Sequence, residues 1–300
     1  MNYVVAVDVG GTEIKSGLVN SSFEVVSTLT MPTPKMDSTG AETVKAISAI
    51  INEFQSLQEI QAIGLAVPGA LDESTGTSRW SGNLMWRNLP IRKLLEDAIN
   101  IQVAFGHDVR TAALAEIKAG AAKNARNAIF IPVGTGIAAA LFIDGEIRSI
   151  DGYAGEIGHI NVGGNFKCVC GKTGCLEAVS STLAISKAYE SKSGISGRTT
   201  EEIFKLVLMG DKVANAVWHD ATVGLARASE LLITILAPEI IVYGGGLSNA
   251  GETLLKPLHE YLDSALTFQR KPKLEIAHFG SKAGTIGCAM LAFELLKAGT

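Results

Sequence analysis

The sequence has 300 residues, of which 47% are hydrophobic and 19% are charged, and its formal net charge at pH 7 is −4. This balance gives no electrostatic reason to expect nucleic-acid binding, and no apolar run reaches the ~18–20 residues of a membrane-spanning helix. The N-terminal stretch is too short and too acidic for a signal peptide. The composition is that of a soluble globular protein, long enough for two lobes that each bury a core.

The chain opens with a predicted hairpin. Two apolar segments of strand length, Tyr3–Val7 and Ile14–Val19, flank the sequence D-V-G-G-T. Glycines at the tip of a hairpin leave the backbone N–H groups bare, so that a phosphate can approach them closely. The aspartate offers a carboxylate for hydrated Mg2+, although an ordinary hairpin with a glycine turn fits the same residues. The candidate phosphate-site residues are Asp8, Gly10, Gly11 and Thr12.

An α/β segment follows this hairpin. Phe23–Thr28 alternates like a strand, Glu42–Leu57 has the apolar period of a helix, and Gln61–Val67 has the length of a buried strand. Leu71–Pro90 is rich in Gly, Ser, Asn and Trp and is predicted to form a long ordered loop.

Asp108 stands at a predicted junction between a strand and a helix. A helix over Pro90–Ile99 and a strand over Ile101–Phe105 precede the sequence G-H-D-V-R-T-A-A-L-A-E. Asp108 opens the next helix, whose N-terminus points towards it. An aspartate in this place is most commonly a helix cap, so its neighbours alone assign it no further role.

The first hairpin recurs later in the chain. Ala128–Val133 and Ile137–Ile143 are predicted strands joined by a short turn, and a hairpin turn at Asp144-Gly145 leads into a third strand. The two strand–turn–strand units lie about 125 residues apart, and each opens an α/β stretch. The repeat suggests an internally duplicated, two-lobed ATPase, and Gly134, Thr135 and Gly136 form its second candidate phosphate site.

The stretch Gly155–Glu177 concentrates potential metal ligands. Cys168, Cys170 and Cys175 lie close together in it, and His159 sits nine residues before the first of them. Three thiolates and one imidazole suit a closed tetrahedral zinc site, and the glycines allow so short a loop to curl around one ion. A disulfide between the outer two cysteines, or unligated core cysteines, would also fit. Thiolate ligands without a secretory signal suggest the reducing cytoplasm.

The remaining third of the chain is predicted to be mainly helical. Thr199-x-x-Glu202 has the pattern of a capping box, and Val213–Leu236 is a long helix that stops before a proline. A strand over Ile240–Tyr243 then runs into Gly244, Gly245 and Gly246, where a flat ring could lie against backbone or the chain could simply turn. A final apolar helix over 285–296 carries Cys288, which is expected to be buried.

Two of these motifs resemble the signature of the ROK family (repressors, ORFs and kinases), which includes sugar kinases with the hexokinase/actin-like ATPase fold. The matching sequences are G-E-I-G-H at 155–159 and C-x-C-G-x-x-G-C-x-E at 168–177. The D-x-G-G-T sequence resembles the first phosphate motif of the actin-like ATPases, and the likeness runs from Asp8 to the last helix. It implies an α/β fold of two actin-like (ribonuclease H-like) lobes with a nucleotide and sugar cleft between them. We expect a small lobe of residues 1–110 and 285–300, and a large lobe of residues 111–284 that carries the zinc loop 155–177.

The resemblance also implies roles for single residues. Asp108 matches the catalytic base that takes the proton from the attacking sugar hydroxyl as the γ-phosphoryl group moves. The zinc is structural in this family, and the three consecutive glycines lie on the adenosine side. Asn83 stands in an N-L-x-W sequence, one residue shorter than the N-L-x-x-W element of family glucokinases, and would bond sugar hydroxyls unless it is only a turn residue. His159 would bind zinc through one ring nitrogen and sugar through the other, and the two glutamates would contact sugar unless they form salt bridges. The implied sugar-binding residues are Asn83, His107, Asp108, Glu156, His159 and Glu177.

His107 and Arg110 depart from the family pattern N-D-x-N-x-A-A-L-x-E. The usual asparagine touches the sugar. A neutral histidine can still donate one hydrogen bond and accept one, but its shape differs and it can titrate near neutral pH. The departure leaves the choice of sugar open, but not the kinase chemistry.

These observations together predict a cytoplasmic, ATP-dependent sugar kinase that uses Mg2+ and phosphorylates a hexose, with glucose at its 6-hydroxyl as the first choice. N-acetylmannosamine or N-acetylglucosamine is the alternative substrate. A sugar-responsive repressor would carry an N-terminal winged helix-turn-helix, for which the seven residues before Asp8 leave no room. A non-catalytic sugar-sensing protein is a further alternative. Family members are usually dimers or tetramers, and the donor, ATP or polyphosphate, stays open.

Overall fold

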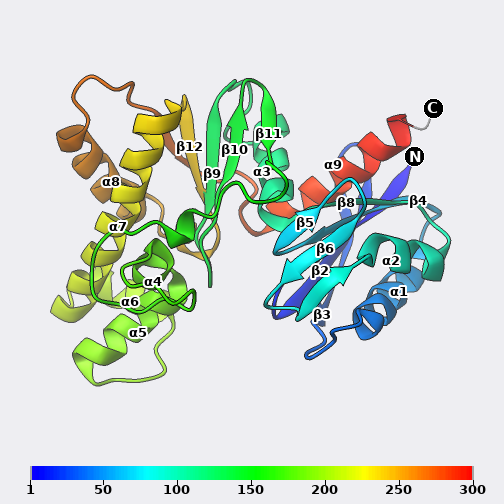
Figure 1. Cartoon of the computed structure of the whole chain (residues 1–300), viewed down its shortest axis with the longest axis horizontal. Helices are drawn as coiled ribbons and strands as arrows, with labels where there is room; N and C mark the ends of the chain where they lie inside the picture. Colours follow the sequence, from blue (N-terminus) through cyan, green and yellow to red (C-terminus); the bar gives the residue numbers. More distant parts are fainter. Residues whose placement is uncertain (1, 299–300) are drawn as a thin grey trace. The chain divides into compact units, whose positions relative to one another are not determined.

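The computed structural model describes residues 2–298, which form two compact units (Figure 1). Unit 1 contains the described residues up to Ala119, together with Ser149–Tyr153 and those from Lys282 onward. Unit 2 contains Gly120–Arg148 and Ala154–Ser281. None of the helices within residues 2–298 combines the length and apolarity needed to cross a bilayer.

Unit 1 is built on a five-stranded sheet with the strand order β3-β2-β1-β4-β8. The first three strands pair antiparallel, whereas β1, β4 and β8 run parallel. The predicted hairpin is confirmed, because Val9 pairs with Ile14 across its tip. The sheet comprises β1 (Tyr3–Val9), β2 (Glu13–Asn20), β3 (Val25–Pro32), β4 (Ile60–Val67) and β8 (Val103–His107).

Helices cover both faces of this sheet. Alternate residues of a strand point to opposite faces, so Val5 and Val7 of β1 pack in the cluster that α1 and α2 complete, while Val4 and Ala6 pack with α9. Close packing of α9 needs a glycine, since a Cβ on Gly64 of β4 would lie 1.8 Å from a backbone oxygen of that helix. The helices of unit 1 are α1 (Ala41–Gln55), α2 (Ile91–Ile99), α3 (Asp108–Ala119) and α9 (Ala283–Ala298).

The stretch Leu71–Pro90 is not the predicted loop. It contributes most of a small antiparallel sheet with the order β5-β6-β7, whose strands are β5 (Ala70–Asp72), β6 (Thr77–Ser81) and β7 (Trp86–Leu89). Strands of three to five residues between Gly, Ser and Asn turns leave little hydrophobic alternation in the sequence, which is why the pattern indicated a loop.

Unit 2 repeats the topology of unit 1. Its sheet has the order β11-β10-β9-β12-β13, with antiparallel pairs around β10 and parallel pairs around β12. This equivalence confirms the internal duplication predicted from the two glycine turns. The strands are β9 (Ala128–Pro132), β10 (Ala140–Ile143), β11 (Glu146–Arg148), β12 (Ile240–Gly244) and β13 (Lys273–Ile276).

Five α-helices accompany this sheet, among the described residues: α4 (Leu176–Ser180), α5 (Thr182–Ser193), α6 (Thr200–Leu208), α7 (Lys212–Leu236) and α8 (Glu252–Ala265). Short 3-10 helices lie at Ile157–His159, at Gly246–Ala250 and at Gly280–Lys282, where the chain passes from unit 2 to unit 1. The predicted capping box is present, with the Thr199 hydroxyl accepting from the Glu202 N–H at 3.2 Å and the Glu202 carboxylate accepting from the Thr199 N–H at 2.8 Å.

The two units divide differently from the lobes expected from the sequence. Helix α3 belongs to unit 1, so the first division falls after Ala119 instead of after residue 110. The physical reason is close packing of α3 on α9, since a Cβ on Gly287 would lie 1.8 Å from the Thr111 backbone oxygen. Cys288 of α9 is fully buried, as predicted, and its thiol lies 3.3 Å from the Val7 carbonyl oxygen.

Candidate active site

The first glycine hairpin is a rigid turn with an accessible tip. The Gly10 N–H donates to the Glu13 carbonyl at 2.9 Å. Buried Thr33 fixes the tip from the side, because its hydroxyl donates to the Gly10 carbonyl at 2.7 Å and its N–H to the Thr12 carbonyl at 2.9 Å. Gly11 and Thr12 remain exposed. The tip therefore has the open backbone that phosphate contact requires.

Asp8 and Asp108 interact electrostatically at the carboxyl edge of the unit 1 sheet. Asp8 lies near the end of β1, and Asp108 follows the last residue of the parallel strand β8. Burial, together with the nearby charge of Asp108, raises the pKa of Asp8 from 3.8 to about 7, and Lys15 acts in the opposite direction. Asp8 also lies against the first turn of α9, since a Cβ on Gly284 would approach its carboxylate to 2.2 Å. Desolvated carboxylates of this kind suit a cation or a proton transfer.

Asp108 is the first residue of α3, where its side chain is partly exposed. Its Oδ1 accepts from the Val109 N–H at 2.7 Å and lies 3.2 Å from the Nδ1 of buried His107. The same Val109 N–H also donates to the His107 Nδ1 at 3.2 Å, so the helix start is shared between the two side chains and occupies only one carboxylate oxygen of Asp108. A carboxylate positioned in this way can also act as a base.

Glu73, in the turn after β5, was not singled out from the sequence. Its Oε1 accepts from the His107 N–H at 3.1 Å and from the Arg110 Nε–H at 3.2 Å. These two donors flank Asp108 in the chain. A single glutamate in a Ser- and Gly-rich segment carries no pattern that would have indicated this contact.

Asn83 lies beside the glycine hairpin. A Cβ on Gly11 would come within 3.3 Å of the Asn83 Cβ, so a larger residue at position 11 would crowd it. Asn83 is exposed, whereas neighbouring Trp86 is buried and donates from its indole N–H to the Asp37 carbonyl at 2.8 Å. Trp86 is thus a core residue that fixes the segment carrying Asn83.

In unit 2 the second glycine turn and the glycine triplet lie next to each other. The Gly134 N–H donates to the Gly136 carbonyl at 3.0 Å, which closes the turn. Val133, just before it, donates to the Gly244 carbonyl at 2.9 Å and accepts from the Leu247 N–H at 3.2 Å. Two motifs that are about 110 residues apart in sequence therefore form one backbone surface.

A cavity of about 640 Å3 opens beside the glycine triplet. Its wall combines apolar side chains of α6 and α7 with backbone of the segment Gly246–Ala250. Phe204 and Trp218 stack there with ring centroids 5.3 Å apart. A planar, largely apolar ligand fits such a wall. The main lining residues are Thr182, Phe204, Leu208, Trp218, Gly246 and Leu247.

Glu177, at the first turn of α4, contacts the second glycine turn. Its Oε2 accepts from the Ile137 N–H at 3.1 Å, and a Cβ on Gly136 would lie 2.8 Å from the same oxygen. Within residues 2–298 neither Glu156 nor Glu177 forms an ion pair, so the salt-bridge alternative does not explain them. Glu156 is exposed, just before the turn that carries His159.

His159, Cys168, Cys170 and Cys175 form one cluster whose ligand atoms all lie within 4.8 Å of one another. The Cys170 and Cys175 sulfurs are 3.6 Å apart, and the His159 Nδ1 lies 3.7 Å from the Cys168 sulfur. Tetrahedral zinc with bonds of about 2.3 Å places its sulfur ligands ~3.8 Å apart, so the geometry fits. All four cysteines of the chain are free thiols, which excludes the disulfide alternative.

The chemistry of this donor set also suits a metal. Burial and the neighbouring thiols raise the pKa of Cys175 to about 12, so that an isolated thiolate would be unfavourable there, and a bound cation would supply the missing charge. The ring contact uses Nδ1 of His159, which leaves Nε2 on the opposite edge of the ring. One histidine can therefore serve two neighbours.

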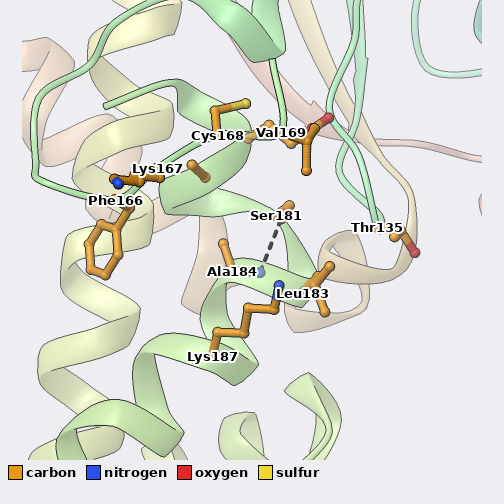
Figure 2. Close-up of a pocket in the computed structure, with 11 residues that line it drawn as sticks. Thr135, Phe166, Lys167, Cys168, Val169, Ser181, Leu183, Ala184 and Lys187 are labelled. Carbon is orange, nitrogen blue, oxygen red and sulfur yellow. Dashed lines mark hydrogen bonds between the residues drawn. The ribbon is translucent and has the colours of Figure 1, made fainter. Parts of the chain in front are cut away.

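Figure 2 shows a smaller pocket of about 150 Å3 between the cysteine loop and α5. Thr135 of the second glycine turn and Cys168 both line it. Ser181 caps α5 at its floor, where its hydroxyl accepts from the Ala184 N–H at 3.1 Å. The cysteine loop and the second glycine turn thus share one pocket wall.

Comparisons with known proteins agree with this architecture. The model of the ROK family matches residues 4–294. A glucokinase of Halalkalibacterium halodurans is 34% identical over an alignment of 310 positions, which spans 95% of this chain and 93% of that protein. A xylose repressor of Caldicellulosiruptor bescii is 28% identical over 261 residues, which cover 81% of this chain and 65% of the repressor.

Two solved structures are similar over nearly the whole chain. A ROK family glucokinase from Streptomyces griseus, in complex with glucose and AMPPNP, has a TM-score of 0.87 at 26% identity, and the match covers 98% of this chain and 100% of the glucokinase chain. A ROK hexokinase from Thermus thermophilus has a TM-score of 0.80 at 31% identity and covers 99% and 100%. The chain belongs to the ROK family, and the predicted α/β fold of two actin-like units is confirmed.

Proposed function

We propose that the chain is an ATP-dependent sugar kinase that transfers the γ-phosphoryl group to the 6-hydroxyl of a hexose, with glucose as the substrate. The observation that carries this proposal is the arrangement in unit 1. Asp8 and Asp108 are electrostatically coupled at one sheet edge, and Asp8 lies one residue before the end of the strand that leads into the Gly10–Thr12 turn. The glucokinase relatives and the glucose-bound structure support the choice of sugar.

Asp108 is the proposed base. A carboxylate at the start of α3 can accept the proton of the attacking hydroxyl while its other oxygen is held by the Val109 N–H. Removal of the proton as the oxygen attacks phosphorus avoids a cationic intermediate at the hydroxyl. We expect such a base to contribute about 10²–10⁴-fold to the rate.

The sugar contacts that we propose come in two sets, one in each unit. Unit 1 supplies Asn83, His107 and Asp108, and unit 2 supplies Glu156, His159 and Glu177. Carboxylates and amides suit a sugar because each can bind more than one hydroxyl, and buried polar groups left unpaired would reject a sugar that lacks those hydroxyls. His107 replaces the amide that the family pattern has, so we expect it to influence the choice among hexoses.

The nucleotide is proposed to bind through backbone. Gly10, Gly11 and Thr12 would contact phosphates in unit 1, and Gly134, Thr135 and Gly136 would do so in unit 2. Gly244, Gly245 and Gly246 would border the adenosine, whose ring fits the cavity lined by Phe204. Mg2+ bound with ATP would neutralise phosphate charge, and we propose that Asp8 would hold its water shell.

Zinc is proposed as a structural ion at His159, Cys168, Cys170 and Cys175. Its role would be to hold the loop that ends in α4, and thereby Glu177. Free thiols in such a cluster also favour the reducing cytoplasm as the compartment. Elemental analysis of the purified protein should find about one zinc per chain, and Cys175→Ser should lose it.

The function is tested by a coupled ADP-release assay with Mg-ATP. The panel contains glucose, mannose, fructose, allose, N-acetylglucosamine and N-acetylmannosamine. Asp108→Asn should reduce turnover by ~10²–10⁴-fold, whereas Asp97→Asn, on the exposed face of α2, should retain it. Turnover of no sugar by the wild type, or equal turnover by Asp108→Asn, would reject the kinase proposal. Preferential use of an acetamido sugar would keep the kinase and replace glucose.

A further inference from the structure

Arg110 and Glu73 form an ion pair next to the proposed base, in which the arginine is buried and the glutamate is partly exposed. The Arg110 side chain is only 6% exposed, and its Nε–H donates to the Glu73 Oε1 at 3.2 Å. Its Nη2 also lies 3.2 Å from that oxygen, without hydrogen-bond geometry, and has no exposed surface. Arg110 thus brings a buried positive charge whose nearest counter-charge is a single carboxylate oxygen.

The turn that carries Glu73 is itself well fixed. Asp72 accepts from the Ser74 hydroxyl at 2.6 Å and from the Thr75 N–H at 3.2 Å, and it pairs with Arg79 at 3.0 Å. These contacts hold the pKa of Asp72 well below its usual range, with the Ser74 hydroxyl as the largest cause. Because the turn is fixed, the Glu73 carboxylate is held in place for the groups that donate to it.

Glu73 binds the residue before Asp108 and the residue two positions after it. Glu73 accepts from the His107 backbone N–H at 3.1 Å on one side and from the Arg110 side chain on the other. The β8–α3 junction is therefore clamped across the base. Because the Arg110 Nη2 is shielded from solvent, a ligand cannot reach it without displacing the side chain. The charged contact that Arg110 makes in this structure is with Glu73, so it is placed to act through that residue.

We propose that the Glu73–Arg110 ion pair fixes the position of Asp108, the proposed base. Arg110 stands where the family pattern usually has a small or amide residue. This inference rests on the proposed kinase function. Positioning matters because a displacement of about 1 Å at a reacting group can cost ~10²-fold in rate. Loss of the pair should therefore lower kcat and leave substrate affinity nearly unchanged.

The test uses Glu73→Ala and the double variant Glu73→Ala/Arg110→Met in the full-length protein. The double variant removes the cation that Glu73→Ala would leave buried and unpaired, which protects folding. Both should lower kcat by ~10–100-fold, with KM for ATP and for the sugar within about threefold of wild type. In hydrogen exchange, the His107 amide should lose protection in both variants.

Glu96→Ala is the matched control. Glu96 accepts from the Val103 N–H at 2.9 Å, so it makes the same kind of carboxylate–backbone bond at the opposite end of the same strand. It should leave kcat within twofold of wild type. Unchanged kcat in the folded double variant, or an equal loss in Glu96→Ala, would overturn the positioning role. An inactive wild type would instead reject the kinase function, so the two failures are distinguishable.

Discussion

Replacing Asp8 by Asn should stabilise the protein without ligands while it removes kinase activity. The carboxylate of Asp8 is desolvated and lies near the charge of Asp108, and these two effects raise its pKa to about 7. A carboxyl group whose pKa is higher in the folded than in the unfolded state destabilises the fold as it ionises. Asn resembles the protonated form and carries no such cost.

The size of the effect follows from the two pKa values. The folded value of about 7 lies roughly three units above the ordinary 3.8, and each unit corresponds to about 1.4 kcal/mol. The full cost, about 4 kcal/mol, develops as the pH rises from 3.8 to 7 and is constant above that range. Because Asp8 is partly exposed, water screens part of it, and we expect about 2 kcal/mol at pH 8. At pH 5 the expected difference is at least twofold smaller.

Urea denaturation of the wild type and Asp8→Asn at pH 5 and pH 8 measures this difference. The gain should be larger at pH 8, with equal m values. Asp97→Asn is the control, since Asp97 forms an exposed pair with Lys93 and should shift stability by less than about 0.5 kcal/mol at either pH. A gain that does not depend on pH, or a loss of stability at pH 8, would refute the reasoning about desolvation.

Two further predictions concern unit 2. Gly245→Ala should lower the thermal midpoint measurably, because Gly245 has φ +74° and a Cβ there would lie 2.4 Å from the Val133 carbonyl oxygen. Gly246→Ala is the control: a Cβ at position 246 would have no neighbour within 4 Å, so this variant should unfold within about 1 °C of wild type. Phe204→Ala should raise KM for ATP several-fold with kcat and the sugar KM nearly unchanged, because it removes one wall of the 640 Å3 cavity. Steady-state kinetics with ATP as the varied substrate checks this, and an unchanged KM for ATP would place the adenosine elsewhere.

Local patterns made much of the fold predictable. Both glycine hairpins and the capping box at Thr199 depend on contacts between residues a few positions apart, so the local sequence is enough to predict them. The duplication followed from the recurrence of one such unit, and the metal cluster from thiols spaced for a single ion. Each hairpin, the capping box and the metal cluster is encoded within about 20 residues, and the duplication is visible because one such unit recurs.

Contacts between distant segments could not be predicted in this way. Glu73 lies 34 residues before His107, and the sequence around Glu73 gives no indication of its contact with the His107 N–H. The small sheet β5-β6-β7 has strands too short to show alternation. Phe204 reads as one more apolar position of a helix, and only the packing of α6 beside the glycine triplet makes it a cavity wall. In each case the role of the residue or strand depends on tertiary contacts that the local sequence does not predict.

The metal cluster and the second glycine turn are linked through α4, so loss of the metal should affect both substrates. Cys175 immediately precedes α4, Glu177 holds the Ile137 N–H, and the Thr182 N–H after the helix donates to the Gly134 carbonyl at 2.9 Å. Both ends of the second glycine turn thus depend on the segment that the cysteine loop supports. Cys170→Ser should therefore raise KM for ATP as well as KM for the sugar, each by severalfold, in kinetics run below the unfolding temperature of the variant. A rise in the sugar KM alone would show that the loop supports only the sugar residues and that the turn holds its shape without it.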